Sequence, residues 1–566
     1  MTARYRRYRH TPLAASVVVL GLLSTAFAPA SSTAQSDVDA GTASIDGIPV
    51  TYYTDSDDST LQPVVLELVR TIDETGQTTG TGRWANQGYA YAYAVIGEDV
   101  CGDLQGALDQ QMVRGIVDYV AGHRAGADDV FLPGVDGRVV AYAEDELGGM
   151  LLAAAASTQG VQLAGVATAG AVIDPHEVRF SDGNVARTSA TTVALRSPLC
   201  PDGPDATIPN RNAYWDSRDL SLRPESLSGT PTLFLHDGAG PSPAAPLLEL
   251  WQGLNPAEQK RATHRELIIA PAPVSPRFGD QTVTPQPLDL FVESLFDGDP
   301  TGRYRYGNPV RINHGAASCD LGGCYTRGGA AWGTNLLDQV STTSLFLNRT
   351  VEQDLSCIPV CVPGPGTGES GTLESVNRFE PPHAPVSTWL DGGADSETLT
   401  QDDPLNDDTG IVGDVALSVG HGYHSLAFQT AAVTRPTRIL GRVELDGHFQ
   451  TGAAGGTITP ILVHESNGTT DIIARGALDL DFHADTATRN HVNGWKAATI
   501  RFDLANTVLA KGDRLMVILQ SNNIDHFEAG TAQGTVNIAT GPVDAVTDRG
   551  AVLRIPVLSL YGSPFG

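Results

Sequence analysis

The sequence predicts an α/β domain over residues 43–307, followed by an all-β domain over residues 308–566. In the first part, short apolar runs alternate with segments of helical period, which is typical of a mainly parallel sheet with helices on both faces. In the second part, short apolar runs recur between clusters of Gly, Asn, Asp and Pro, and no helical segment separates them. That pattern indicates an antiparallel sandwich or jelly roll.

The first 34 residues have the composition of a targeting segment. Four arginines precede an apolar run at 13–27, and small residues at 28–30 or 32–34 offer a cleavage site. The apolar run is too short to cross a membrane comfortably, and no later stretch is long and apolar enough to do so. We therefore expect residues 1–34 to be a signal peptide and the mature protein to be secreted to the extracellular space, without membrane insertion.

The spacing of the hydrophobic residues predicts the strands and helices of the α/β domain. Alternating tyrosines and alanines from Tyr89 to Val95 predict a strand. A helix is predicted within 104–120, where one helical face carries Leu108, Met112, Ile116, Val117 and Val120. A short cap region is expected at about 175–228. The other strands are predicted over 63–69, 139–143, 163–172, 231–236 and 266–270, and a further amphipathic helix over 245–254.

The β domain is predicted from short apolar runs bounded by turn residues. The predicted strands include residues 344–347, 425–428, 438–445, 457–463, 499–502, 514–519 and 552–557.

One turn in the α/β domain has the layout of a nucleophile elbow. A strand-like run ends at the acidic residues Glu144, Asp145 and Glu146, and Gly148 and Gly149 then open an alanine-rich apolar helix. In an α/β hydrolase, a serine sits on such a strained turn between strand and helix, with its oxygen exposed above the sheet. Counting two residues back from the first glycine places Glu146 at that position.

The charge balance disfavours two classes of partner. The chain has 36 basic and 65 acidic residues, a net charge of -29. Nucleic acid or an anionic membrane would require a basic face, so neither is expected as a partner. No cofactor is predicted.

The cysteines favour disulfide bonds, because an even number in an exported protein is typical of a disulfide framework. Local loops between Cys319 and Cys324 and between Cys357 and Cys361 would leave Cys101 with Cys200, although six cysteines allow fifteen pairings. Neither close spacing is C-x-x-C and no histidine follows at a finger-like distance, so no metal site is predicted.

The chain resembles the Xaa-Pro dipeptidyl-peptidase and cocaine-esterase-like family of serine hydrolases, which have an α/β hydrolase fold followed by a jelly roll. The resemblance rests on the order and spacing of landmarks over nearly the whole mature chain. Besides the elbow they are residues 53–58, 84–89, 116–126, 212–215, 218–219 and 291–298 in the first domain, and 434–446 and 511–515 in the second. The resemblance implies a hydrolase ancestry and, for residues 308–566, the C-terminal β domain of that family.

The catalytic triad of the family does not carry over. Acyl transfer needs a nucleophile, a histidine and a carboxylate that orients the histidine. The corresponding positions are Glu146, Val274 and Gly240, so no catalytic residues are expected. The oxyanion-hole segment is also altered, since residues 71–83 contain neither the tyrosine nor the proline of the family turn.

The leading hypothesis is therefore an exported pseudo-hydrolase that binds a peptide or another small ligand. Its pocket would contain Glu144, Asp145, Glu146, His236 and Asp237, and the acidic corner would pair with an ammonium group. One alternative is a working peptidase or acyl-ester hydrolase with a rearranged catalytic set that recruits a histidine from elsewhere. Another is a structural or cell-surface interaction protein. A homo-oligomer and an assembly with an active paralogue are both compatible with the sequence.

Overall fold

The structure is a computed structural model of the 566-residue chain. It describes residues 38–55, 61–71, 84, 87–97, 103–157, 162–180, 211–236, 243–254, 264–269, 287–298, 310–312, 340–350, 371–376, 383–384, 386–391, 425–451, 457–480, 489–490, 494–520, 534–541, 550–558 and 565. The expected signal peptide, all six cysteines, and the positions Asp237, Gly240 and Val274 lie outside these ranges.

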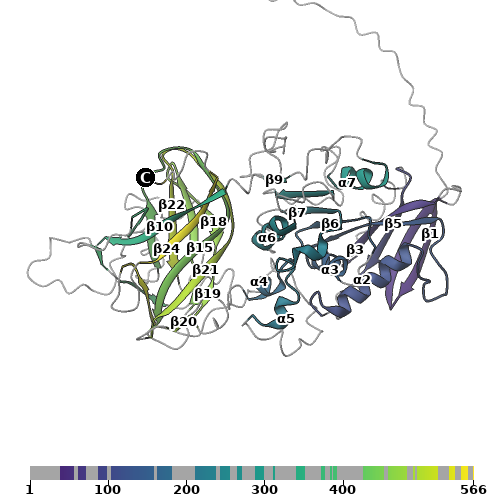
Figure 1. The fold of residues 1–566 in the computed structure, drawn as a ribbon, viewed down its shortest axis with the longest axis horizontal. Helices are drawn as coiled ribbons and strands as arrows, with labels where there is room; N and C mark the ends of the chain where they lie inside the picture. Colours follow the sequence, from purple (N-terminus) through teal and green to yellow (C-terminus); the bar gives the residue numbers. More distant parts are fainter. Residues whose placement is uncertain are drawn as a thin grey trace, which may run out of the picture.

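The first domain contains a nine-stranded sheet in the order β1-β2-β4-β3-β5-β6-β7-β8-β9 (Figure 1). Only the pairs β1–β2 and β2–β4 are antiparallel, so the sheet is mainly parallel, as predicted. The last strand lies beyond residue 307, where the sequence predicted the domain to end. The strands are Val38–Ile45, Ile48–Asp55, Gln62–Val69, Ala90–Val95, Val135–Glu144, Gly165–Ala169, Thr232–His236, Arg265–Ile269 and Val310–Ile312.

Helices cover both faces of this sheet, because the strands are apolar on both sides. Alternate residues of β3 divide between two hydrophobic clusters, with Leu66 in one and Val65 in the other. The first cluster includes α2 (Ala107–Val120), α3 (Asp145–Ala156) and α6 (Ala244–Leu254). The second includes α7 (Pro287–Phe296) and the tyrosines of β4.

The apolar face predicted for α2 is buried only over the C-terminal half of the helix. Ile116, Val117 and Val120 are buried, as predicted, but Leu108 is 59% exposed. The first turn of α2 instead turns Asp109 inward, where backbone N–H groups of the preceding loop bind its carboxylate. A polar residue with local backbone partners thus replaces an apolar one at the start of the helix.

The region 175–228, where the sequence predicts a cap, contains three short helices in its described residues. They are α4 (Pro175–Arg179), α5 (Ala213–Asp216) and the 3-10 helix η3 (Pro224–Leu227). Trp215 is fully buried and packs edge-on against His176 and Phe180, at centroid distances of 5.4 and 5.7 Å. The same cluster includes Leu104 and Val172, which belong to the main domain, so the cap is anchored to it by apolar contacts.

The second domain is all-β in its described residues, as predicted, and forms one branched 13-stranded sheet and a two-stranded pair. The predicted strand 457–463 is two strands, β16 (Thr457–Ile458) and β17 (Ile461–Ser466), interrupted at Pro460, which cannot donate to a ladder. The longest strands are β15 (Thr437–Thr451) and β21 (Lys496–Leu509), which pair with each other. The others are Val340–Thr350, Gly371–Glu374, His383–Ala384, Val386–Asp391, Ser425–Thr430, Thr457–Ile458, Ile461–Ser466, Thr469–Arg475, Leu478–Asp479, Arg489–Asn490, Arg514–Gln520, Gly534–Ala539 and Val552–Leu558.

Candidate functional site

The turn between β5 and α3 has the strained backbone of an elbow at Asp145, which has a φ of +50°. Its side chain is exposed, whereas that of Glu146 is buried. Gly170, at the end of the neighbouring strand β6, leaves room for this carboxylate: a Cβ there would lie 2.7 Å from Asp145 Oδ1. The residue with left-handed backbone and an exposed side chain is therefore Asp145. It lies one residue before Glu146, the predicted nucleophile position.

Glu146 forms an ion pair with Arg70, with a distance of 2.5 Å between Oε2 and Nη2. Arg70 directly follows β3, and its Nη1 also donates to the backbone oxygen of Ile96, 3.1 Å away at the end of β4. The guanidinium of Arg70 therefore connects the carboxyl ends of the parallel strands β3 and β4 with the first turn of α3. In an active hydrolase the corresponding region holds donors for the oxyanion.

Burial raises the pKa of the Glu146 carboxyl from 4.5 to about 7. Arg70 opposes this shift, whereas the charges of Asp109 and Asp145 add to it. Burial is also the main reason that the pKa of Asp109 is raised. Near neutral pH, Glu146 is therefore able to gain or lose a proton, which is the property of a general acid or base.

The remaining predicted pocket residues are only partly brought together. Glu144 is half-buried at the end of β5, and the hydroxyl of Tyr142 donates to its Oε1 at 2.5 Å. His236 is 2% exposed at the end of β7, two strands from β5 in the sheet order. Asp237 lies outside the described residues.

Sequence reasoning missed the roles of Arg70 and Gln105. Arg70 was visible as a single basic residue ending an apolar strand, but its partner lies 76 positions away. Gln105 is buried in a loop with a φ of +67°, and its Nε2 donates to the backbone oxygen of Val172 at 2.8 Å. Neither pattern has a signature in the local sequence.

Gly149, in the second turn of α3, keeps this part of the site closely packed. A Cβ at Gly149 would lie 2.1 Å from Gln105 Nε2 and 2.4 Å from the backbone oxygen of Val172. We expect Gly149→Ala to lower the free energy of unfolding by about 1–3 kcal/mol, because the overpacking outweighs the better helix propensity of alanine. Urea unfolding measures this. Gly229→Ala is the control, since nothing lies within 4 Å of its Cβ position; equal stability of the two variants would contradict the prediction.

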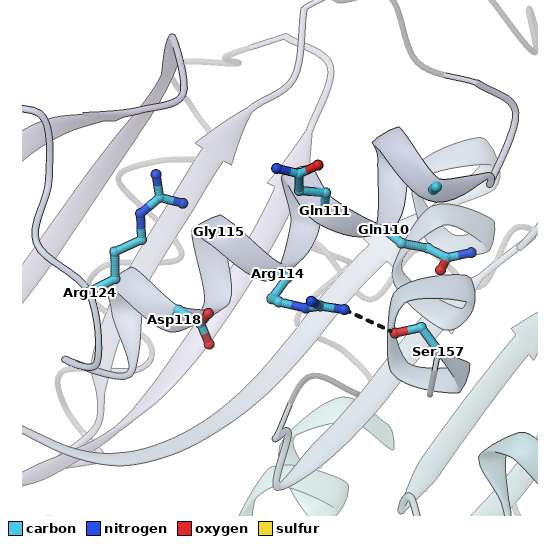
Figure 2. A pocket seen from close by; sticks show the side chains of 8 residues that line it. Gln110, Gln111, Arg114, Gly115, Asp118, Arg124 and Ser157 are labelled. Carbon is cyan, nitrogen blue, oxygen red and sulfur yellow. Dashed lines mark hydrogen bonds between the residues drawn. The ribbon is translucent and has the colours of Figure 1, made fainter. Parts of the chain in front are cut away.

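A separate cavity of about 610 Å³ lies along α2, away from the elbow. Figure 2 shows its polar lining, including Gln110, Arg114 and Ser157, with Arg114 Nη2 3.4 Å from the Ser157 hydroxyl. Ser157 follows the last residue of α3, and a twelve-residue helix is about 18 Å long. The cavity is therefore at the opposite end of α3 from Asp145 and is not part of the elbow.

The described residues show neither a metal site nor a membrane-spanning helix. They contain no group of three or more His, Cys, Asp or Glu side chains arranged to hold a metal ion. No helix among them is long and apolar enough to cross a membrane.

The fold and the elbow define the class of protein: an α/β hydrolase fold with a C-terminal β domain. Residues 365–551, within the second domain, match the X-Pro dipeptidyl-peptidase C-terminal non-catalytic domain. The predicted resemblance to the Xaa-Pro dipeptidyl-peptidase and cocaine-esterase-like family is confirmed.

Several solved structures are similar over both domains. An aminopeptidase from a marine sediment Thaumarchaeota archaeon is 12% identical, with a TM-score of 0.60 over 95% of this chain and 99% of its own. An α-amino acid ester hydrolase is 13% identical, with a TM-score of 0.59 over 96% and 100%. A CocE/NonD family hydrolase from Staphylococcus aureus is 12% identical, with a TM-score of 0.58 over 92% and 93%. At identities this low, the TM-scores show a shared fold and nothing further. No curated protein sequence matches the chain.

Proposed function

We propose that this chain is an exported pseudo-hydrolase, which uses the elbow to bind an amine-bearing peptide or small ligand without turning it over. The main support is the ion pair between Arg70 and Glu146, which occupies the first turn of α3 beside the elbow. The sequence adds that the elbow has no serine and that no histidine occurs from residue 265 to residue 313. A serine mechanism needs both residue types.

The ligand class follows from the charge at the elbow. Asp145 presents an exposed carboxylate at the carboxyl edge of the sheet, where ligands of open α/β sheets bind. A carboxylate and an ammonium group form a charge-assisted hydrogen bond. Two of the similar structures are an aminopeptidase and an α-amino acid ester hydrolase, names that describe substrates with an amino group. We take a free amino terminus as the chemistry most compatible with this site.

Absence of turnover is the first expected result. The purified mature protein should hydrolyse neither Xaa-Pro-anilides nor short acyl esters, and an active-serine probe should not label it. Loss of a nucleophile or base alone costs about a million-fold in a serine protease, so activity above the blank is not expected.

Binding is the second part of the same test. An Xaa-Pro dipeptide with a free amino group should bind more tightly than its acetylated form by calorimetry. Asp145→Asn should weaken binding by about tenfold, equivalent to about 1.4 kcal/mol for one charged contact. Asp129→Asn is a matched control, because Asp129 is also an exposed aspartate with positive φ, in a different turn. Equal affinity of the free and acetylated peptides would refute the ligand class.

A working hydrolase with a rearranged catalytic set remains the second candidate. It is favoured by one observation: a carboxylate, that of Asp145, occupies the strained and exposed position of the elbow. A carboxylate nucleophile forms an ester that water must then hydrolyse, with a histidine as base. Turnover that disappears in both Asp145→Asn and His236→Gln would establish this candidate and refute the pseudo-hydrolase.

A further inference from the structure

The β domain is packed into the core of the first domain. Leu440 of β15 and Leu504 of β21 are buried, and both belong to the hydrophobic cluster that contains α2, α3 and α6. Figure 1 shows α4 and α6 on the side of the first domain that faces the β domain. The interface is therefore a continuation of one hydrophobic core.

Arg442 crosses this interface and binds two elements of the first domain. Its Nη2 donates to Glu177 Oε2 of α4 at 3.0 Å, and its Nε lies 2.9 Å from Glu249 Oε1 of α6 in a second ion pair. The Arg442 side chain is 12% exposed. Burial alone would lower the pKa of Arg442, but the two carboxylates outweigh it and raise the pKa. A single residue of the β domain thus joins the cap to the main fold.

Asp503 supplies a second polar link. Its Oδ1 accepts hydrogen bonds from the backbone N–H groups of Ala244 and Ala245, at 3.1 and 3.3 Å. These are the first two residues of α6, whose N–H groups have no partner within the helix. The start of α6 is therefore capped by a residue of the other domain. The helix dipole favours a negative charge at this position, whereas burial raises the pKa of Asp503.

A short path, made of the backbone of residues 172–174 and one hydrogen bond, connects α4 with the elbow. Asp174 caps α4 by accepting from the N–H of His176 at 2.9 Å. Two residues earlier, the N–H of Val172 donates to the backbone oxygen of Asp145 at 3.2 Å. The backbone of residues 172–174 therefore links the start of α4 to the strained residue of the elbow.

We propose that Arg442 is a positioning residue for the elbow: by binding Glu177 it fixes α4, and through residues 172–174 it holds Asp145 in place. The β domain, described in its family as non-catalytic, would then set the geometry of the ligand site. The part of this inference that concerns ligand affinity rests on the proposed function, whereas the part that concerns α4 does not.

Hydrogen exchange tests the structural part in the full mature chain. In Arg442→Gln, the amides of residues 172–180 should exchange at least about tenfold faster than in the wild type, because the opening of α4 becomes easier. Arg554→Gln is the matched control: Arg554 also pairs with two carboxylates, Glu444 and Asp446, but both lie within the β domain. Its exchange in residues 172–180 should equal that of the wild type.

A milder variant keeps the test decisive if Arg442→Gln does not fold. Glu177→Gln keeps the shape of the contact, leaves Arg442 paired with Glu249, and should also accelerate exchange in residues 172–180. Where Arg442→Gln does fold, the double variant should show little further acceleration over either single variant, because both changes remove the same pair. Wild-type exchange in the folded single variants would overturn the proposal, as would an equal effect of Arg554→Gln.

Ligand binding provides the second readout. A dipeptide with a free amino group should bind Arg442→Gln about tenfold more weakly than the wild type, and Arg554→Gln with unchanged affinity. Unchanged affinity in a variant with faster exchange would overturn the link from α4 to the elbow. If the wild type binds no such peptide, the proposed function fails, and the exchange comparison still decides whether Arg442 holds α4.

Discussion

Replacing Glu146 with glutamine is expected to raise the free energy of unfolding at pH 8 by up to about 3 kcal/mol, since one pKa unit corresponds to about 1.36 kcal/mol. The pKa of Glu146 rises from 4.5 to about 7 on folding, so the folded protein holds this proton more tightly than the unfolded chain. Stability from this group is fully present below pH 4.5 and is lost as the pH rises through 7. Glutamine resembles the protonated acid and keeps an acceptor for Arg70, but it has no proton to lose.

The measurement is urea unfolding from pH 4 to pH 8.5, taken as the difference between variant and wild type. That difference should be near zero at pH 4 and should grow through the interval from 4.5 to 7. Glu225→Gln is the control, because Glu225 is exposed, and its curve should follow that of the wild type. A constant difference between Glu146→Gln and wild type across the whole range would show that Glu146 does not titrate in this way.

Replacing Arg211 with methionine is expected to lower the free energy of unfolding by about 3–5 kcal/mol at pH 8, because it leaves buried carboxylates without their cation. Arg211 donates to Asp174 at 2.9 Å, to Asp216 at 3.1 Å, and also to Asp219. The side chains of Asp174 and Asp219 are only 3% and 2% exposed. Burial, followed by the charge of Asp219, raises the pKa of Asp174 to about 7 even with Arg211 in place.

The free energy of unfolding that Arg211→Met loses should be smaller at pH 5 than at pH 8, because protonation removes the repulsion between the carboxyl groups of Asp174 and Asp219. Urea unfolding followed by tryptophan fluorescence measures both values. Arg138→Met is the control: Arg138 pairs with Asp136 at 2.7 Å but is 48% exposed, so its loss should cost less than about 1 kcal/mol. An Arg211→Met variant as stable as Arg138→Met would contradict the assignment of a buried cluster.

The strands of the first domain were predictable because a parallel sheet buried on both faces requires continuous apolar runs. The run at 63–69 became β3, and the one at 231–236 became β7. The hairpin of β1 and β2 was not predicted, since its Gly, Thr and Asp residues weaken the apolar signal. Local patterns determine these elements, and tertiary packing decides the weaker ones.

The candidate site was only partly predictable for a related reason. The glycine pair placed the turn between β5 and α3, but the residue with positive φ depends on where the strand pairing ends, and that residue is Asp145. The partners of the buried charges are set by the fold: 76 positions separate Arg70 from Glu146, and 265 separate Glu177 from Arg442. Sequence alone identifies such charges but not their pairing.

The helix cap that Asp503 provides for α6 has a consequence for how such two-domain chains can evolve. A recombination event at the junction between the domains would replace the β domain as one gene segment. The incoming segment would need a carboxylate at the start of α6 and apolar side chains where Leu440 and Leu504 complete the first core. The β domain is therefore not a freely exchangeable module, and its inheritance is tied to that of the hydrolase-like domain it covers.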